Sequence, residues 1–268
     1  MRRCSIAAAA FAALVIATPA LAQRATCHKG ASFEQWLDQF KRDATAQGIS
    51  PRTIAAASHQ MVYDQSVVNR DRGQKVFSQT FLQFSDRMVA RHRIDGGIQR
   101  IAKNRALFQR IEQQFGVPAP VIAAFWALET DFGGFMGNLP TIKSVTSLAY
   151  DCRRPEYFTD QLYAALQLVD RGVLSSATRG AMHGEVGQTQ FLPKSILLYG
   201  ADGEGNGGVN LNSKADALAS TANFLKGHGW VRGAGYQPGQ PNFVAIQGWN
   251  AAGVYQQAIA IIGKRIDG

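Results

Sequence analysis

Apolar side chains recur along this chain mostly at the spacing of helices, and stretches that alternate as strands do are scarce. Near the start, Phe33, Trp36 and Phe40 fall on one helical face, and a break at 48–51 starts a second helix. The other expected elements are, in chain order, helix and extended segments over 64–98, helices over 98–115 and 118–133, a loop-rich stretch over 134–160 followed by helix to about 171, a short helix from 193, a helix over 216–226, a short strand over 242–246 and a last helix over 251–262. The pattern predicts a mainly α chain of the α+β type.

One largely apolar segment is predicted to be buried although it contains a glutamate. It begins with Pro118-Ala-Pro, continues through Phe-Trp-Ala-Leu-Glu-Thr, and ends at two glycines. At helical spacing Glu129 shares a face with Phe125, Trp126 and Phe132. Loss of hydration among these rings is expected to raise the pKa of Glu129, so that the acid keeps a proton to donate to a leaving oxygen. The alternative is a structural glutamate, salt-bridged or solvent-exposed at the helix end.

Length and composition predict a well-packed exported protein. With 268 residues and 46% hydrophobic composition, the chain can bury the core of one elaborated domain or two small ones. A basic start, an apolar run over 6–16 and Ala20-Leu-Ala22 predict a signal peptide over 1–22, cleaved after Ala22. No later apolar run approaches the roughly 20 residues that span a bilayer, so no transmembrane segment is expected in the mature chain. We expect the protein in the periplasm.

The net charge and the cysteines indicate which binding partners and which cellular compartment to expect. The formal net charge of +9 falls by two with the arginines of the signal peptide, which suits an anionic partner such as a cell-wall polymer, a nucleic acid or an acidic membrane. Export, and the lack of a basic stripe interleaved with aromatic residues, argue against nucleic acid. Cys27 and Cys152 remain in the mature chain and are expected to form a disulfide, the alternative being two free thiols.

A polar loop over 200–212 follows the spacing of a calcium loop. The possible ligands at its first, third, fifth and ninth positions are Asp202, Glu204, Asn206 and Asn210. Ser213 occupies the twelfth position, where a carboxylate normally completes the shell, so a purely structural turn is an equal alternative. The glycines of this loop do not predict a nucleotide site, because an acid stands among them and no long helix begins at the last one.

The stretch over 183–193 has the character of a ligand-binding turn. Its glycines permit close approach of the backbone, while Gln188 and Gln190 carry amides suited to sugar hydroxyls and acetamido groups. The alternative is a tight turn without a ligand. The histidines show no paired metal spacing, and His183, beside a glycine, is better explained as an ordinary polar residue than as a substrate contact.

Several motifs appear in the order in which one enzyme family carries them. They are Ala-Leu-Glu-Thr-Asp-Phe-Gly over 127–133, Arg-Arg-Pro-Glu-Tyr-Phe over 153–158, Gly-Gln-Thr-Gln-Phe-Leu-Pro over 187–193, Asp-Gly-Glu-Gly-Asn-Gly over 202–207, the helix from 216, Gly-Trp at 229–230 and Trp-Asn at 249–250 with a tyrosine at 255. Over roughly 98–262, and more weakly over 33–60, the chain resembles the lytic murein transglycosylase B family.

The resemblance implies a lysozyme-like helical core that cleaves the bond between N-acetylmuramic acid and N-acetylglucosamine in peptidoglycan. It implies an N-terminal helical segment over 23–97 packed on a catalytic domain over 98–268, acting as a monomer on glycan strands. It makes Glu129 the catalytic acid and assigns a set of cleft residues: Gln190, Tyr157, Asn250, Tyr255 and Arg154. No cofactor is required, and a structural calcium at the 202–213 loop is possible. Where relatives have Gly-Ala-Met-Gly, this chain has Gly184-Glu-Val-Gly187, which places a further carboxylate near the site.

A single acid suffices if the reaction is a transglycosylation. Glu129 protonates the glycosidic oxygen and, as a carboxylate, then takes the proton of the muramyl 6-hydroxyl, which closes a 1,6-anhydro ring. One alternative is a lysozyme-type muramidase that uses water, with Glu185 or Asp131 as second carboxylate. Another is a non-catalytic peptidoglycan-binding protein.

Overall fold

A computed structural model describes residues 27–268, and the expected signal peptide lies outside the described residues. Helices dominate these residues, which confirms the predicted mainly helical class. The helices are α2 (Phe33–Ala46), α3 (Pro51–Ser58), α4 (Gln65–Gly73), α5 (Phe81–Met88), α6 (Arg91–Lys103), α7 (Arg105–Phe115), α8 (Ala119–Thr130), α9 (Thr141–Tyr150), α10 (Pro155–Asp170), α11 (Pro193–Tyr199), α12 (Lys214–Gly227), α13 (Phe243–Trp249) and α14 (Gly253–Asp267). Two short strands, β1 (Leu139–Pro140) and β2 (Arg179–Gly180), pair antiparallel.

Three predicted elements differ from the structure. The strand expected over 242–246 is wrong, because these residues begin α13, whose Ala245 and Ile246 are buried. A run this short has no period that separates strand from helix. The helix expected over 98–115 is two helices, which meet at Asn104. Helix α9 occupies part of the stretch predicted to be loop-rich. Nine of its ten residues are buried, so it lacks the polar face by which a surface helix is recognised.

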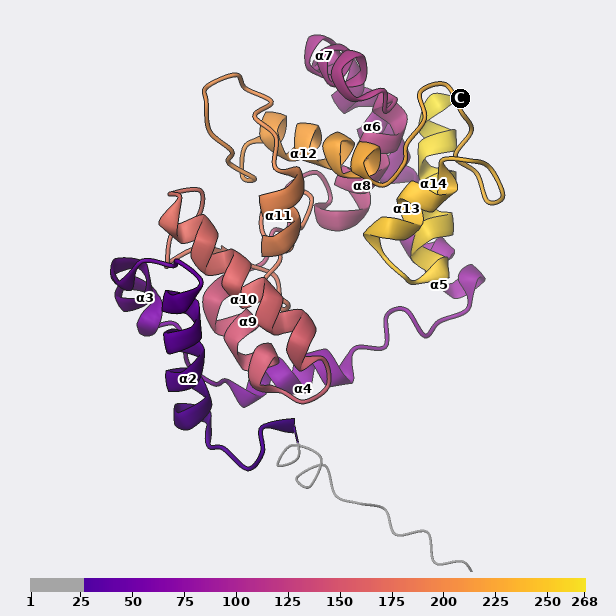
Figure 1. Cartoon of the computed structure of the whole chain (residues 1–268). Coiled ribbons are helices and arrows are strands. Elements are labelled where there is room, and N and C mark those ends of the chain that lie inside the picture. The colour runs from indigo at the N-terminus through magenta and orange to yellow at the C-terminus, as the bar shows by residue number, and fades with distance from the viewer. Residues whose placement is uncertain (1–26) are drawn as a thin grey trace, which may run out of the picture.

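The apolar side chains form two clusters, and the helices that contribute to each occupy different parts of the view in Figure 1. The larger cluster surrounds α8 and joins α5–α7 to α11–α14, while the smaller cluster joins α2–α4 to α9 and α10. Each cluster draws residues from both sides of position 98, so the division into segments 23–97 and 98–268 stays a prediction. The chain between α4 and α5 runs from the smaller cluster to the larger one.

Helix α8 is the buried centre of the larger cluster. Ten of its twelve residues are buried, and it packs mainly against α14 and α6. Pro118 precedes the helix and Pro120 lies in its first turn, where the missing N–H is not needed. The helix ends at Asp131 with φ of 48°, a left-handed conformation that a non-glycine residue adopts only at some cost. Arg93 offsets this cost by donating to both carboxylate oxygens of Asp131, at 2.7 and 3.2 Å.

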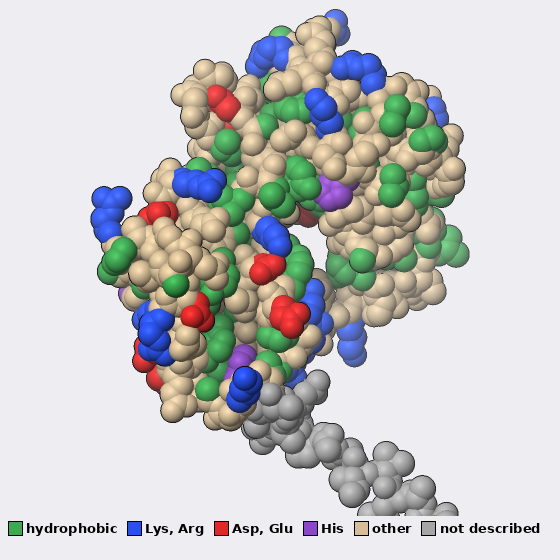
Figure 2. Space-filling view, in the orientation of Figure 1, with side chains coloured by type: hydrophobic (Ala, Val, Ile, Leu, Met, Phe, Trp, Pro, Cys, Tyr) green, Lys and Arg blue, Asp and Glu red, His purple; other side chains and the backbone are tan. Residues whose placement is uncertain are grey.

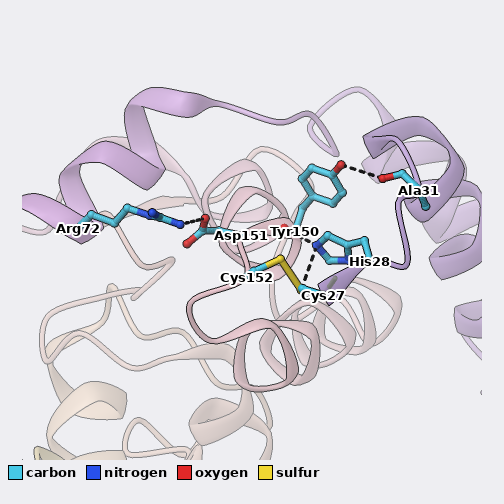
Figure 3. Close-up of a disulfide and its surroundings, with 7 residues drawn as sticks. All are labelled: Cys27, His28, Ala31, Arg72, Tyr150, Asp151 and Cys152. Atoms are coloured by element: carbon cyan, nitrogen blue, oxygen red, sulfur yellow. Dashed lines mark hydrogen bonds and ion pairs between the residues drawn. A yellow bond between two sulfur atoms is a disulfide. The ribbon is translucent and has the colours of Figure 1, made fainter. Parts of the chain in front are cut away.

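The expected disulfide is confirmed (Figure 3). It joins Cys27 to Cys152, 125 residues apart, with their Cα atoms separated by 5.8 Å. Next to it, the His28 ring stacks on Tyr150 with ring centres 4.4 Å apart, and His28 Nε2 lies 2.5 Å from the Tyr150 carbonyl oxygen. The start of the described chain is thus attached to the turn between α9 and α10.

Candidate active site

A cavity of about 720 Å³ opens between the two clusters. Figure 2 shows the surface hollowed between the part that carries α9 and α10 and the part that carries α13 and α14. Six of the predicted site residues line it together: Glu129, Arg154, Tyr157, Gln190, Asn250 and Tyr255. They come from α8, the start of α10, the 183–193 turn and the α13–α14 region, so tertiary packing brings four separate parts of the chain to one space.

Glu129 stands near the end of α8 and points into the cavity. Its Oε1 accepts a hydrogen bond of 2.8 Å from Trp249 Nε1 at the end of α13, and a second from the Tyr255 hydroxyl in α14. Phe125, one turn earlier on α8, contacts the ring of Trp249 with centres 4.7 Å apart. The acid is therefore held in one orientation by neutral donors rather than by a salt bridge.

Burial raises the pKa of Glu129 to about 7. The hydrogen bonds from Tyr255 and Trp249 favour the charged form and oppose this rise, while the negative charge of Glu185 adds to it. Glu129 keeps some accessible surface because it faces the cavity, yet protein atoms crowd its carboxyl group. Desolvation and the negative charge of Glu129 raise the pKa of Tyr255 well above its usual range. The Tyr255 hydroxyl therefore keeps its proton and remains a hydrogen-bond donor.

The aromatic surroundings of Glu129 differ from those expected. Trp126 donates its Nε1 hydrogen to Gln188 Oε1 at 2.9 Å, and Phe132 packs edge-on against the Trp126 ring. These two rings therefore support a neighbouring loop, and the hydrogen-bonding ring at the acid is Trp249. The Trp-Asn motif marked Trp249 as a candidate position in the sequence. Only the packing of α13 against α8 shows that the Trp249 ring donates a hydrogen bond to the acid.

The two glutamines of the 183–193 turn have different positions. Gln190 lines the cavity, in a left-handed backbone conformation with φ of 56°, and its amide donates 2.8 Å to the Gly187 carbonyl oxygen. Gln188 does not line it: besides accepting from Trp126, it donates 2.7 Å to the Asn212 carbonyl oxygen. Both ends of the Gln188 amide are engaged, so this residue joins α8 to the 200–212 loop and the expected sugar contact is not supported.

The remaining predicted residues form the rim of the cavity. Tyr157 is 46% exposed, which leaves its ring available to a ligand. The Arg154 guanidinium lies 4.9 Å from the centre of the Phe158 ring and 5.7 Å from that of Tyr157. The side-chain oxygen of Asn250 accepts a 2.9 Å hydrogen bond from the Ala252 backbone amide. The side-chain nitrogen of Asn250 takes no part in this bond.

A chain of charged groups forms another wall of the cavity. His183 Nε2 lies 2.8 Å from Asp71 Oδ1, and His183 Nδ1 lies 2.9 Å from Glu185 Oε1. Arg153 and Arg154 also donate to Asp71, whose side chain is 1% exposed. Burial alone would lower the pKa of His183, but hydrogen bonds and charges of the two carboxylates outweigh it and raise the pKa to about 9. Sequence analysis missed Asp71, which stands in a polar helix without any motif.

The 200–212 loop holds its shape by hydrogen bonds from its own backbone. Asp202 accepts the amides of Gly205 and Gly207 at 2.6 and 2.7 Å. Asp216, fully buried in the first turn of α12, accepts the amides of Gly203 at 2.8 Å and Asn210 at 2.8 Å. The carboxylates of Asp202 and Asp216 thus fix the backbone of the loop. The calcium-loop spacing did not indicate this role for Asp216.

The candidate calcium ligands form hydrogen bonds within the loop. Glu204 accepts from the Ser213 hydroxyl and from the Asn206 amide, while the Asn210 side chain accepts from the Asn212 backbone amide. Within residues 27–268, the one group of three His, Cys, Asp or Glu side chains close enough to share a metal ion is Cys27, His28 and Cys152, and its two sulfurs form the disulfide. Ca²⁺ takes oxygen ligands that usually include several carboxylates, and Ser213 stands where the loop pattern normally supplies one of them.

Comparison with known proteins identifies the family. Residues 32–239 match the family model described as a transglycosylase SLT domain. The chain belongs to this family. The resemblance expected from the motifs is confirmed.

Two kinds of relative support the assignment. The chain is 30% identical over 171 residues to the membrane-bound lytic murein transglycosylase B of Escherichia coli (strain K12), covering 60% of this chain and 47% of that protein. The chain therefore spans about half the length of the curated relative that it matches. Among solved structures, SltB3 from Pseudomonas aeruginosa in complex with NAG-anhNAM-pentapeptide has a TM-score of 0.82 and 28% identity, covering 89% of this chain and 80% of that one. The Escherichia coli lytic transglycosylase Slt35 in complex with calcium, with a TM-score of 0.75 and 23% identity over 86% of this chain and 92% of that one, shares the fold.

Proposed function

We propose that this SLT-domain protein is a peptidoglycan lytic transglycosylase. It cleaves the β-1,4 bond between N-acetylmuramic acid and N-acetylglucosamine and leaves a 1,6-anhydro muramyl end. The observation that carries the proposal is Glu129, an acid with a pKa of about 7 held by Trp249 and Tyr255 in the wall of a cavity large enough for saccharide units. SltB3, with a TM-score of 0.82 to this chain, was solved in complex with NAG-anhNAM-pentapeptide.

The geometry suits one group that acts first as acid and then as base. Protonated Glu129 donates to the glycosidic oxygen as the bond to the muramyl C1 breaks, and positive charge develops on the sugar. The resulting carboxylate is stabilised by the Trp249 and Tyr255 donors, which strengthen as charge appears on Oε1. It then takes the proton of the muramyl 6-hydroxyl, whose oxygen bonds to C1. Glu129 is protonated again, and no water is consumed.

The muramidase alternative needs a second carboxylate to activate water. Asp131 is unsuited to this role, since both of its oxygens accept from Arg93 and it does not line the cavity. Glu185 does line the cavity, but His183 engages its carboxylate. Both placements favour transglycosylation over hydrolysis.

Analysis of the products tests the proposal. Purified peptidoglycan incubated with the mature protein is expected to yield muropeptides lighter by one water than those from a hydrolytic muramidase, as mass spectrometry detects. Hydrated reducing ends as the main product would establish the muramidase alternative. Binding to sacculi without any soluble product would establish the non-catalytic one.

The pH dependence of cleavage is expected to follow the proton on Glu129. The first step needs the protonated form, so kcat/KM falls as pH rises through about 7, where burial has placed the pKa of Glu129. The base that acts second is formed by the first step and requires no prior ionisation. Initial rates between pH 4 and 9 measure this limb. A decline that begins near the usual glutamate pKa of 4.5 would contradict the proposed environment.

Location and partners follow from the same proposal. We infer that the protein is exported to the periplasm after cleavage at Ala22, which the Cys27–Cys152 disulfide supports, because disulfides persist in oxidising compartments. No helix within residues 27–268 combines the length and apolar character needed to cross a membrane. Its substrates are glycan strands, on which it acts as a monomer. No step of the reaction uses a cofactor.

A further inference from the structure

The linker between α4 and α5, residues 74–80, supplies part of the cavity wall. Val76 and Phe77 line the cavity from this linker. A turn holds the linker in shape, because the Lys75 carbonyl oxygen accepts from both the backbone amide and the hydroxyl of Ser78, at 3.1 and 2.8 Å. The turn encloses Phe77, so the backbone that carries this ring has a defined place in the wall.

The Phe77 ring lies next to a side chain that holds the catalytic acid. The centre of the ring is 6.3 Å from that of Tyr255, with the two planes at 81°, and 6.1 Å from that of Phe84. The Tyr255 hydroxyl in turn donates to Glu129. Phe77 is thus separated from the acid by one side chain, and it remains 37% exposed in the cavity. A ligand that reaches Glu129 meets this ring.

The cavity has two chemically different walls. One wall carries charged side chains that pair with the buried Asp71 or with each other: Arg153, Arg154, His183 and Glu185. The wall around Phe77 is apolar and belongs to the larger cluster, through Val76, Phe84, Met88 and Leu128. Phe77 is therefore part of a continuous apolar surface and not an isolated exposed ring. A ligand that fills the cavity needs polar groups for one wall and an apolar face for the other.

Sugar rings have this two-sided character. The hydroxyl and acetamido groups of a pyranose project from its edge and form hydrogen bonds, whereas its C–H groups form an apolar face that packs on an aromatic ring. We propose that Phe77 is a saccharide-binding residue, whose ring packs against the C–H face of a sugar of the glycan strand beside Glu129. The inference rests on the proposed function, which supplies the glycan. Position 77 lies outside every motif that pointed to the family, so the resemblance assigned it no role.

Binding of glycan without peptide stems tests this role. The probe is a soluble oligosaccharide of alternating N-acetylglucosamine and N-acetylmuramic acid, and isothermal titration calorimetry gives its Kd for Glu129→Gln protein, which is expected to bind without cleaving. Adding Phe77→Ala should raise this Kd about tenfold. Phe77→Tyr should keep the original Kd, because it retains the ring. Phe77→Leu should bind as weakly as Phe77→Ala, since it retains apolar contact with Phe84 but has no ring face.

Phe135→Ala is the matched control, since Phe135 is 76% exposed and does not line the cavity, and its Kd should equal that of the parent. Equal Kd values for Phe77→Ala and Phe135→Ala would overturn the inference. So would a loss of affinity seen only with glycan that carries peptide stems, or no binding of the stem-free probe. If Phe77→Ala does not fold, the comparison of Phe77→Tyr with Phe77→Leu decides. If the parent released no anhydro product, the proposed function would fail, and the binding series would still decide the role of Phe77.

Discussion

Glu129→Gln is expected to lower the rate of glycan cleavage by on the order of 10³-fold while the protein still folds and binds peptidoglycan. Glutamine keeps the shape of the side chain, and its Oε1 can accept from Trp249 and Tyr255 as the carboxylate does. It has no proton to donate to the glycosidic oxygen. Turbidity of sacculi suspensions measures cleavage, and co-sedimentation with sacculi measures binding.

Glu112→Gln is a suitable control, since it makes the same chemical change on α7 and does not line the cavity. It should retain parental activity. Substantial turnover by Glu129→Gln would remove this residue from the mechanism. Loss of both cleavage and binding, with an altered circular dichroism spectrum, would instead indicate a structural role.

Glu129→Gln is also expected to change how the stability of the protein depends on pH. The native state holds the Glu129 proton up to about pH 7, whereas the unfolded chain releases it near 4.5. Between these values the unfolded state binds fewer protons, so this residue lowers the stability of the parent as pH rises. Over this pH interval, the melting temperature of Glu129→Gln, measured by thermal unfolding, should therefore fall less than that of the parent.

Loss of the disulfide is expected to produce the largest change in stability. Cys27 and Cys152 lie 125 residues apart, and the chain-entropy treatment assigns such a cross-link about 5 kcal/mol of unfolding free energy. The double variant Cys27→Ser/Cys152→Ser avoids leaving a single reactive thiol. Its urea midpoint should fall well below that of the oxidised parent and should match the parent in reducing buffer. An unchanged midpoint would show that the cross-link restricts little of the unfolded ensemble.

The disulfide variant is also expected to bind glycan more weakly. Cys152 directly precedes Arg153 and Arg154, which line the cavity and donate to Asp71, and Asp151 accepts a 2.6 Å hydrogen bond from Arg72. Without the cross-link, the turn between α9 and α10 keeps these salt bridges but loses its covalent attachment to Cys27. A raised KM with a nearly unchanged kcat would reflect this, because the hydrogen bonds that hold Glu129 come from Trp249 and Tyr255, which lie outside this turn.

Prediction from sequence succeeded where neighbouring residues decide the outcome. The buried acid in α8 was recognisable because aromatic and aliphatic residues surround it at helical spacing, and the helix limits followed from prolines and glycines. It failed over 134–160 and 242–246. There, small polar residues in a buried helix and a short apolar run carry no period that separates the alternatives.

The amino-acid sequence by itself determined the helical class, the disulfide pairing, the acid at position 129 and the residues that meet it at the cavity, because each depends on local spacing or on an ordered set of motifs. Only the tertiary structure decided which groups touch Glu129, why Gln188 is withdrawn from the cavity, and that Asp71 and His183 orient Glu185. The contacts of Glu129 with Trp249 and Tyr255, of Trp126 with Gln188 and of Asp71 with His183 join residues 62 to 126 positions apart. Side-chain chemistry can be read along a chain, but desolvation and hydrogen-bond geometry arise only once distant helices pack together.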